Sequence, residues 1–528
     1  MSSTEPTLET LAPRDEITPT VETESLADVP QLPLGKALAS LSYVFWIVGA
    51  MEMVERLAFY GVAGVRTIYA TRSVAEGGLG VTPSKFGWIL SIWALFQSFV
   101  PVLTGGLSDR LGYKETIFLS TVIKISGYLV MAFFPSYWGF FAGALLLATG
   151  TAIFKPGIQG TLVNSTKREN SSMAWGVFYQ TVNIGGFIGP LLAGYMRKLA
   201  WQNVFLACAA VICLNFLLLL TYKEPGKAAR LSRQRDEKAR NVVQKSLWRE
   251  SLNELKKAHV WSYLLIFSGF WFMFNALFDV LPNHIEDWVD TRGLVSWIFG
   301  ASPASPGPVV AFFIDLNKEG TEILPEGMLN IDAGLIMTTC FLFAWLSGKM
   351  KAITSMVVGT LLATLGLFLS GYSALGWISV FAISVFAVGE MLSSPKFSEF
   401  IGNFAPSDKK AMYLGFSQIP LAIGWTLEGK IGPTIYGAMG SKEAFARQML
   451  VERGFPADLV AVPQGKAFST LVDALHQPAW DVTATLYAQH QASIAGVWYI
   501  MGGVGIVSAL GIWLYGRWIQ KRAVALAA

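Results

Sequence analysis

Charged residues are scarce in this chain of 528 residues. Asp, Glu, Lys and Arg together make up 14% of it, whereas hydrophobic residues make up 53%. Soluble globular proteins carry about 25% charged residues. This deficit excludes a water-soluble enzyme of such length, and it predicts an integral membrane protein that crosses the bilayer many times.

Cysteine and histidine are rarer still. The three cysteines, Cys208, Cys213 and Cys340, all lie in apolar runs, so no disulfide framework is expected. No two of the four histidines lie within five residues of each other, which argues against a cluster of metal ligands. Nucleophile elbows, metal motifs and phosphate-binding loops are also missing from the sequence. We therefore expect no enzyme activity, no metal, no cofactor and no nucleic-acid partner.

Long apolar runs are what the sequence has in abundance. A helix needs about 20 mostly apolar residues to cross the roughly 30 Å hydrocarbon core of a bilayer. Twelve runs meet this requirement: 41–69, 86–107, 116–135, 138–163, 173–196, 201–222, 260–281, 331–349, 353–372, 375–403, 411–437 and 494–517. The sequence thus predicts an all-α membrane protein with twelve transmembrane helices, in two six-helix bundles over 41–222 and 260–517.

The distribution of Lys and Arg between the loops sets the expected orientation. The linker 223–259 holds eleven basic residues against five acidic ones, whereas 282–330 holds two against seven and 438–493 holds four against five. We therefore place the linker and both chain ends inside the cell, in a plasma or inner membrane. Residues 1–40 are acidic and lack an apolar core, so they are expected to form a disordered cytoplasmic tail, and 518–528 a second, short tail.

Three segments outside the spans are expected to form helices of their own. Ser232–Leu255 alternates charged residues with Leu, Val and Trp, which favours a helix lying on the inner membrane surface. In the long outer segment 438–493, helical patterning surrounds Lys442–Glu452 and Ala467–Leu475. Outer segments as long as this one and 282–330 are uncommon unless they are functional or partly structured.

Three ionisable residues stand in the first spanning run. Glu52, Glu55 and Arg56 are three and four residues apart, so their side chains share one helix face. An ionisable group inside the bilayer is costly and is a functional candidate by default. Two carboxylates this close cannot both ionise cheaply, so one of them can take up and release a proton.

Other polar groups lie near prolines inside later spans. Lys155 precedes Pro156, and Glu390 stands five residues before Pro395. Interrupted helices near the bilayer midplane are where transporters place binding sites. The remaining polar candidates are Asn183 in the fifth span and Asn330 and Asp332 at the start of the eighth. Together these groups can offer cations to a substrate carboxylate and an anion to a substrate amine.

Three further charges receive a structural interpretation. Lys124 is expected to snorkel, which means that its stem follows the apolar surface while its ammonium group reaches the interface. Lys430 is expected to pair with Glu428 two residues away. The Gly185-Gly186 pair is interpreted as a site of close helix packing.

Several motifs resemble a known family. The string GGLSDRLGYK at 105–114 is similar to the loop motif of the major facilitator superfamily, carried here by Gly105, Asp109, Arg110 and Gly112. The helix 1 string Glu52-x-x-Glu55-Arg56 with Tyr60-Gly61 resembles the signature of the proton-dependent oligopeptide transporter family within it. Further matches are Thr116-Ile117, Phe154-Lys155-Pro156, Phe178-Tyr179, Asn183-x-Gly185, Gly389-Glu390 and Ser394-Pro395.

The resemblance implies a fold, a mechanism and residue roles. The fold would be the major facilitator fold, and the activity would be symport of protons with di- or tripeptides by alternating access. Glu52, Glu55 and Arg56 would couple proton movement to substrate binding. The substrate-binding set would be Arg56, Tyr60, Lys155, Asn183, Asn330 and Glu390, with Lys155 at the peptide carboxylate and the last three at its amino end. Asp109 and Arg110 would pair with neighbouring helix ends.

The chain departs from the family pattern in its outer gate. The family commonly has a second arginine on helix 1 that pairs with an acid on helix 7, but here Ala63 and Asn275 occupy these positions. Arg66 lies three residues beyond Ala63, and Asp279 lies four beyond Asn275. At 1.5 Å per residue, both shifts are about 5 Å in the same direction. We therefore expect Arg66 and Asp279 to form a gate displaced by one turn, with two independent interfacial charges as the alternative.

Two departures in the pocket walls leave the cargo open. Phe59 replaces one tyrosine of the usual pair, and Trp425 stands where the family has a small polar residue. The same fold and coupling could therefore serve nitrate, an amino-acid conjugate or another small anion. A sensor or scaffold without transport is the remote alternative. The lipid bilayer and a small substrate, most simply a short peptide, are the partners that the sequence predicts.

Overall fold

The computed structural model is built from α-helices. It describes residues 34–167, 170–228, 231–232, 253, 255–348, 350–404 and 416–527. The long helices of the N-terminal half are α2 (Tyr43–Thr71), α3 (Pro83–Leu111), α4 (Tyr113–Phe133), α5 (Tyr137–Ser165), α6 (Ser171–Arg197) and α7 (Trp201–Leu220). Those of the C-terminal half are α10 (Ala258–Asp279), α14 (Pro325–Gly348), α15 (Ala352–Tyr372), α16 (Gly376–Phe404), α18 (Gln418–Met439) and α22 (Ala479–Ala527).

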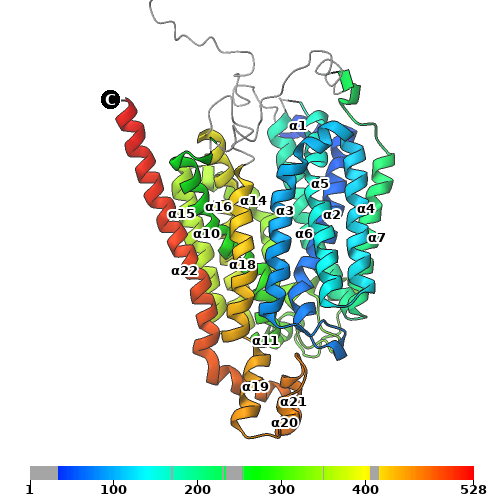
Figure 1. Ribbon diagram of the computed structural model, residues 1–528, viewed down its shortest axis with the longest axis vertical. Helices are drawn as coiled ribbons and strands as arrows, with labels where there is room; N and C mark the ends of the chain where they lie inside the picture. The colour runs from blue at the N-terminus through cyan, green and yellow to red at the C-terminus, as the bar shows by residue number, and fades with distance from the viewer. Residues whose placement is uncertain are drawn as a thin grey trace, which may run out of the picture.

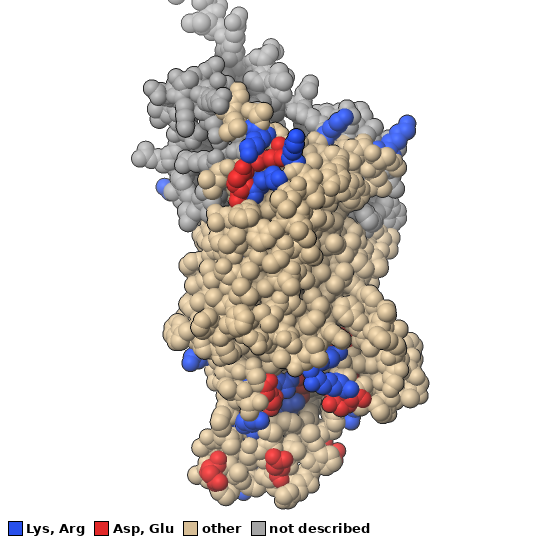
Figure 2. Space-filling model, turned by 90° about the vertical axis from the view of Figure 1, so that its right-hand side faces the viewer, with Lys and Arg blue, Asp and Glu red and all other residues tan. Residues whose placement is uncertain are grey.

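These long helices correspond to the apolar runs of the sequence. Among the described residues, seven of them are long and apolar enough by composition to cross a membrane. Helix α2 carries the four charges Glu52, Glu55, Arg56 and Arg66 along an otherwise apolar helix. On the face drawn in Figure 2, a broad belt without charged residues separates two charged ends, as expected for a protein whose middle faces lipid.

The helices form two groups, one from each half of the chain. In the first half, α2 packs on α6 and α4 on α5, while in the second α15 packs on α16 and α10 on α18. Across the boundary, α3 packs on α18 and α6 on α14. Figure 1 shows the two groups side by side, with α18 next to α3. The arrangement confirms the predicted all-α fold with two helical bundles.

The two ends of the molecule differ. We call the end that bears the short helix α1 (Leu34–Ala39) and the C-terminus of α22 the terminal face (Figure 1). The opposite end, the loop face, carries α11 (Leu281–Trp288), α12 (Arg292–Phe299) and α13 (Pro308–Ile314) between α10 and α14. It also carries α19 (Lys442–Glu452), α20 (Ala457–Val460) and α21 (Ala467–Leu475) between α18 and α22.

The helices α19 and α21 confirm two predicted segments at their predicted bounds. The Ser441 hydroxyl accepts a hydrogen bond from the N–H of Ala444 and so caps the start of α19. Phe445, Leu450 and Leu471 form a small apolar core with Trp288 of α11. The indole of Trp288 also donates to the carbonyl of Gly440 at 2.7 Å, which anchors this unit to α18.

Two segments of the terminal face carry expectations from the sequence, the N-terminal tail and the surface helix. The tail was expected to be disordered to residue 40, but α1 forms within it, with Ala37 buried against the first bundle. It is held there because the amide of Asn170 donates to the Ser40 hydroxyl at 2.8 Å. The rest of that tail, and most of the expected surface helix Ser232–Leu255, lie outside the described residues.

The predicted interruptions at two prolines are wrong. Helix α5 continues through Pro156 and α16 continues through Pro395. A proline removes one backbone hydrogen bond, and neighbouring helices or side chains can satisfy the freed group inside a membrane bundle. The last span is also longer than expected, because α22 begins at Ala479 on the loop face.

Candidate functional site

The three ionisable residues of α2 form one buried cluster. The Arg56 Nε lies 3.3 Å from Glu52 Oε1, and the guanidinium group also forms an ion pair with Glu55. All three residues are buried, and Glu55 is only 1% exposed. One arginine therefore faces two carboxylates on its own helix, as the three- and four-residue spacing predicts.

A lysine from another helix completes this cluster. Lys124 of α4 lies with its Nζ 3.3 Å from Glu55 Oε1 and 3.9 Å from the ring centre of Phe154. The hydroxyl of Thr151 donates to the same Glu55 oxygen at 3.2 Å. Lys124 is 1% exposed, so the snorkelling interpretation is wrong. Burial between α2 and α5 leaves its ammonium group no route to the interface, and Glu55 compensates its charge.

A cavity of about 430 Å³ lies beside this cluster, between the two halves. Its N-terminal wall includes Glu52, Arg56, Tyr60 and Lys155. Among the described residues, Lys155 has no ion pair or hydrogen bond, so its ammonium group is available to an anion. The volume lies within the range of about 300–1,000 Å³ that is typical of small-molecule sites.

The opposite wall carries acidic and amide groups. Glu390 lines the cavity and also a side pocket of about 50 Å³, together with Asn330 and Asp332. Buried oxygens of Asp332 and Glu390 and both polar atoms of Asn330 have no hydrogen-bond partner in the described part of the chain. Asn183 lines both spaces, and its amide donates to the carbonyl of Tyr179 at 3.0 Å. Polar groups buried without a partner are suited to a ligand that brings the missing hydrogen bonds.

The cavity therefore has one basic wall and one acidic wall. The basic side combines two acidic residues, Glu52 and Glu55, with three basic ones, Arg56, Lys124 and Lys155. On the other side, Asp332 and Glu390 face no cation among the described residues. All proposed substrate-binding residues line the cavity or its side pocket. Asp332, a polar candidate of the sequence that the family resemblance does not include, lies beside them in the side pocket.

Arg66 and Asp279 lie in direct contact where the cavity approaches the loop face. They form an ion pair between α2 and α10, with both side chains buried. The indole of Trp425 on α18 donates to Asp279 Oδ2 at 2.9 Å, and the guanidinium group of Arg66 lies over the rings of Trp93 and Trp425. The alternative of two independent interfacial charges is therefore wrong, while the role of the pair as a gate stays a prediction.

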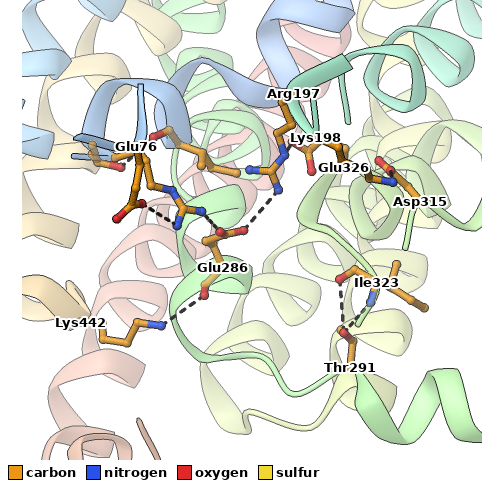
Figure 3. Close-up of polar contacts among 12 residues, drawn as sticks. Glu76, Arg197, Lys198, Glu286, Thr291, Asp315, Ile323, Glu326 and Lys442 are labelled. Atoms are coloured by element: carbon orange, nitrogen blue, oxygen red, sulfur yellow. Dashed lines mark hydrogen bonds and ion pairs between the residues drawn. The ribbon is translucent and has the colours of Figure 1, made fainter. Parts of the chain in front are cut away.

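Beyond this pair, a network of ion pairs joins the two halves at the loop face. Glu286 of α11 pairs with Arg72 at the end of α2 and with Arg197 of α6, the latter at 3.4 Å. Figure 3 shows Arg197 pointing toward Glu286, with Glu326 of α14 on its other side. The Arg197 Nε lies 2.8 Å from Glu326 Oε1.

Two further ion pairs extend the network. Lys198 pairs with Asp315 at 2.8 Å, and Lys466 of the loop before α21 pairs with Glu76 at 3.4 Å. Burial alone would raise the pKa of Glu286, but Arg72 and Arg197 outweigh it and hold that pKa at about 2. Each of these pairs takes one partner from each half, so the loop face is closed in this conformation.

The loop motif at 105–114 lies at the end of α3. Gly105, Asp109 and Arg110 belong to its last turns, and their side chains are outside the described part of the structure. Gly112 follows α3 with φ of 115°, a conformation that side chains rarely permit, and α4 begins at the next residue. The glycine thus allows the tight connection between the two helices.

The predicted pairing of Lys430 with Glu428 is wrong. The Lys430 ammonium group donates to the carbonyl and the hydroxyl of Ser84 on α3, at 2.6 and 3.0 Å. Residues two apart on a helix point in different directions, so the two side chains cannot meet. Glu428 instead faces α10.

Comparison with known proteins agrees with this fold. The family model of the Major Facilitator Superfamily matches residues 45–427. The multidrug resistance protein MdtH of Edwardsiella ictaluri is 22% identical over 66% of this chain and 77% of its own length. The peptide transporter YePEPT of Yersinia enterocolitica is 29% identical, but over only 28% of this chain and 30% of its own length.

Solved structures share the fold over almost the whole chain. A peptide transporter POT in complex with sulfate superposes with a TM-score of 0.63 at 15% identity, over 95% of this chain and 99% of that one. A POT family transporter in complex with a thioalcohol-conjugated peptide gives 0.64 at 15% identity, over 94% and 99%. With the family model covering more than half of its residues, this chain belongs to the Major Facilitator Superfamily of membrane transporters.

Proposed function

We propose that this protein is a proton-coupled symporter of di- and tripeptides, in the proton-dependent oligopeptide transporter family, and that it works by alternating access. The observation that carries the proposal is the cavity with Lys155 on one wall and Asn330, Asp332 and Glu390 on the other. A short peptide is a dipole with a carboxylate at one end and an ammonium group at the other. The two walls complement those two ends.

The buried cluster on α2 supports proton coupling. Glu52 and Glu55 are both buried, and Glu52 borders the cavity through which a substrate would pass. An intramembrane carboxyl group with two possible charge states is what a proton carrier requires. The names of the structural neighbours, several of which are peptide transporters, support the choice of cargo.

The loop face is the outer side in this proposal. The basic linker 223–259 then lies inside the cell, in agreement with the positive-inside rule. Ion pairs between the halves close the loop face. The cavity extends from Arg66 toward the terminal face, where Ser394 of α16 and Gln418 of α18 line it. The conformation is therefore closed to the outside, and opening to the outside must break the pairs around Arg66 and Glu286.

The function can be tested in proteoliposomes with an acidic outside and a negative inside. We expect labelled dialanine to accumulate against its gradient and a protonophore to abolish that accumulation. Glu55→Gln should abolish accumulation and leave counterflow exchange partly intact, because exchange needs no net proton movement. Proton uptake driven by nitrate or by an amino-acid conjugate, with no response to dialanine, would replace the peptide with another cargo. No gradient-driven uptake of any substrate would contradict symport altogether.

The gate role of Arg66 and Asp279 needs its own experiment. Arg66→Ala and Asp279→Ala should each impair transport, because each breaks the buried ion pair between the two halves. Exchanging the two charges, with Arg66→Asp and Asp279→Arg together, should restore part of the uptake. A swapped protein that is as inactive as the single variants, although it is folded and inserted, would contradict the gate.

A further inference from the structure

Glu428 is a buried carboxyl group to which the transport scheme above assigns no role. It lies on α18, one turn from Trp425 toward the loop face, and it is 0% exposed. Neither of its carboxyl oxygens accepts a hydrogen bond from a donor in the described part of the chain. Leaving a buried ionised carboxylate without a donor is among the most expensive arrangements in a protein. The position therefore requires an explanation.

The neighbours of Glu428 are a second acid and one base. The described charged groups that face it are Asp279 from α10, whose carboxyl group it contacts, and Arg66 from α2. The other helices packed on α18 are α3 and α22, and their described residues present no charge to it. Trp425 shows how Glu428 and Asp279 are placed. It lies on the same side of α18 as Glu428, three residues away, and its indole donates a hydrogen bond to Asp279.

The charges of the trio Arg66, Asp279 and Glu428 do not balance. Asp279 already accepts from Arg66 at one oxygen and from Trp425 at the other. A contact between two carboxyl groups is favourable only when a proton lies between them, because two carboxylates repel each other. With one arginine for two acids, the closed conformation is neutral only if one carboxyl group is protonated. Glu428, which has no donor of its own, is the natural holder of that proton.

We propose that Glu428 and Asp279 share a transported proton, at a site separate from the Glu52–Glu55–Arg56 cluster. When the loop face opens, Arg66 moves away with the first half, and the two acids face the outer solution without a cation. The pair then takes up one proton as a carboxylate becomes a carboxylic acid. Closure returns Arg66 to Asp279 while Glu428 keeps the proton. Arg66 and Trp425 line the cavity, so the proton leaves through that side to the water inside.

This inference rests on the proton coupling proposed above, and a charge-neutral variant tests it. Glu428→Gln keeps the shape of a protonated glutamic acid but can neither bind nor release a proton. We expect the number of protons moved per substrate, measured from the static-head gradient in proteoliposomes, to fall by one, while counterflow exchange persists. Glu452→Gln is the matched control, because Glu452 is exposed on α19 and contacts Gln448 of its own helix.

Two results would overturn the inference. An unchanged proton ratio in Glu428→Gln, in a protein whose wild type is proton-coupled, would make Glu428 a permanently protonated structural group. If the variant fails to fold, infrared difference spectra of the wild type decide the matter. We expect a carboxylic-acid carbonyl band that disappears as the pH rises. This band should shift in frequency when glutamate carries an isotope label in its carboxyl group, and it should not shift when only aspartate is labelled. A band that never titrates would contradict the proposal, whereas missing peptide uptake alone would contradict only the proposed function.

Discussion

At the scale of single residues, the distinction that matters is between cations with and without a protein partner. Lys124 and Arg56 are both committed to Glu55, whereas Lys155 faces the cavity with no partner among the described residues. A buried cation paired with a carboxylate holds that carboxylate in place, and a cation without a partner can bind an incoming anion. The two lysines should therefore respond differently to substitution.

Replacing Lys155 should change substrate selectivity. We expect Lys155→Ala to weaken the binding of peptides with a free C-terminal carboxylate by about tenfold or more, and of their methyl esters much less, since a charge-assisted hydrogen bond contributes about 1.5–3 kcal/mol. Competition against labelled peptide uptake measures both affinities. Lys430→Ala is the control, because Lys430 does not line the cavity and contacts Ser84 of α3 instead. An equal loss for acid and ester would remove Lys155 from the carboxylate site.

Replacing Lys124 should instead reduce stability. Lys124→Met leaves Glu55 with one fewer partner in a buried site, and breaking such a pair costs about 3–5 kcal/mol. Adding Glu55→Gln to the same protein should recover part of that loss, because the uncompensated charge is removed. Thermal unfolding of the single and double variants in detergent gives the coupling between the two positions. Strictly additive losses would mean that the contact of 3.3 Å contributes nothing.

At the scale of elements, the contact between α2 and α6 positions the charged cluster against the cavity. A methyl group added at Gly185 would lie 2.5 Å from the carbonyl oxygen of Met53 and 2.9 Å from the nitrogen of Leu57. These are backbone atoms, so neither can rotate away. The close approach of the two helices explains why glycine stands there, as the interpretation of the Gly185-Gly186 pair predicts.

The neighbouring glycine provides an internal control for this contact. We expect Gly185→Ala to push α6 away from α2 and to lower stability by about 1–3 kcal/mol, the usual cost of overpacking. Gly186→Ala should have little effect, because the nearest atom to its new methyl group is Tyr60 Cδ2 at 3.4 Å, an ordinary contact. Melting temperatures in detergent compare the two. Equal melting temperatures would show that the helices separate without cost.

At the scale of the whole molecule, ion pairs join the two halves at the loop face. Glu286 of the second half contacts Arg72 and Arg197 of the first, and Arg197 continues to Glu326. When the loop face opens, water hydrates both partners of a broken ion pair and compensates for the lost contact, whereas apolar surface gains no such compensation. An interface of this kind suits a transporter that must open and close on that side.

The depressed pKa of Glu286 sets the pH range over which its ion pairs stabilise the folded protein. Its pKa in the folded protein is about 2, below the ordinary 4.5. Its contribution to the free energy of unfolding is therefore fully present above pH 4.5 and is lost as the pH falls toward 2. We expect Glu286→Gln to lower stability by about 2 kcal/mol at neutral pH. The difference in melting temperature from the wild type should be the same at pH 7 and pH 5 and should shrink below 4.5. A difference already lost at pH 6 would contradict this assignment.

The sequence by itself determined the elements and their local charges. Apolar runs located the long helices, and the spacing within α2 placed Glu52, Glu55 and Arg56 on one face, because both patterns are properties of a single helix. The helical patterns at Lys442–Glu452 and Ala467–Leu475 are local in the same sense. The parallel shift of Arg66 and Asp279 along two helices even predicted a contact between them.

Only the tertiary structure decided which groups from different helices share a partner. Lys124 was assigned to the interface and Lys430 to Glu428, but packing turns the first toward Glu55 and the second toward Ser84. The rotation of a helix about its axis depends on all the neighbours that it packs against, and that rotation decides whether a charge meets lipid or a counter-ion. For that reason the trio that includes Glu428 could not be found in the sequence.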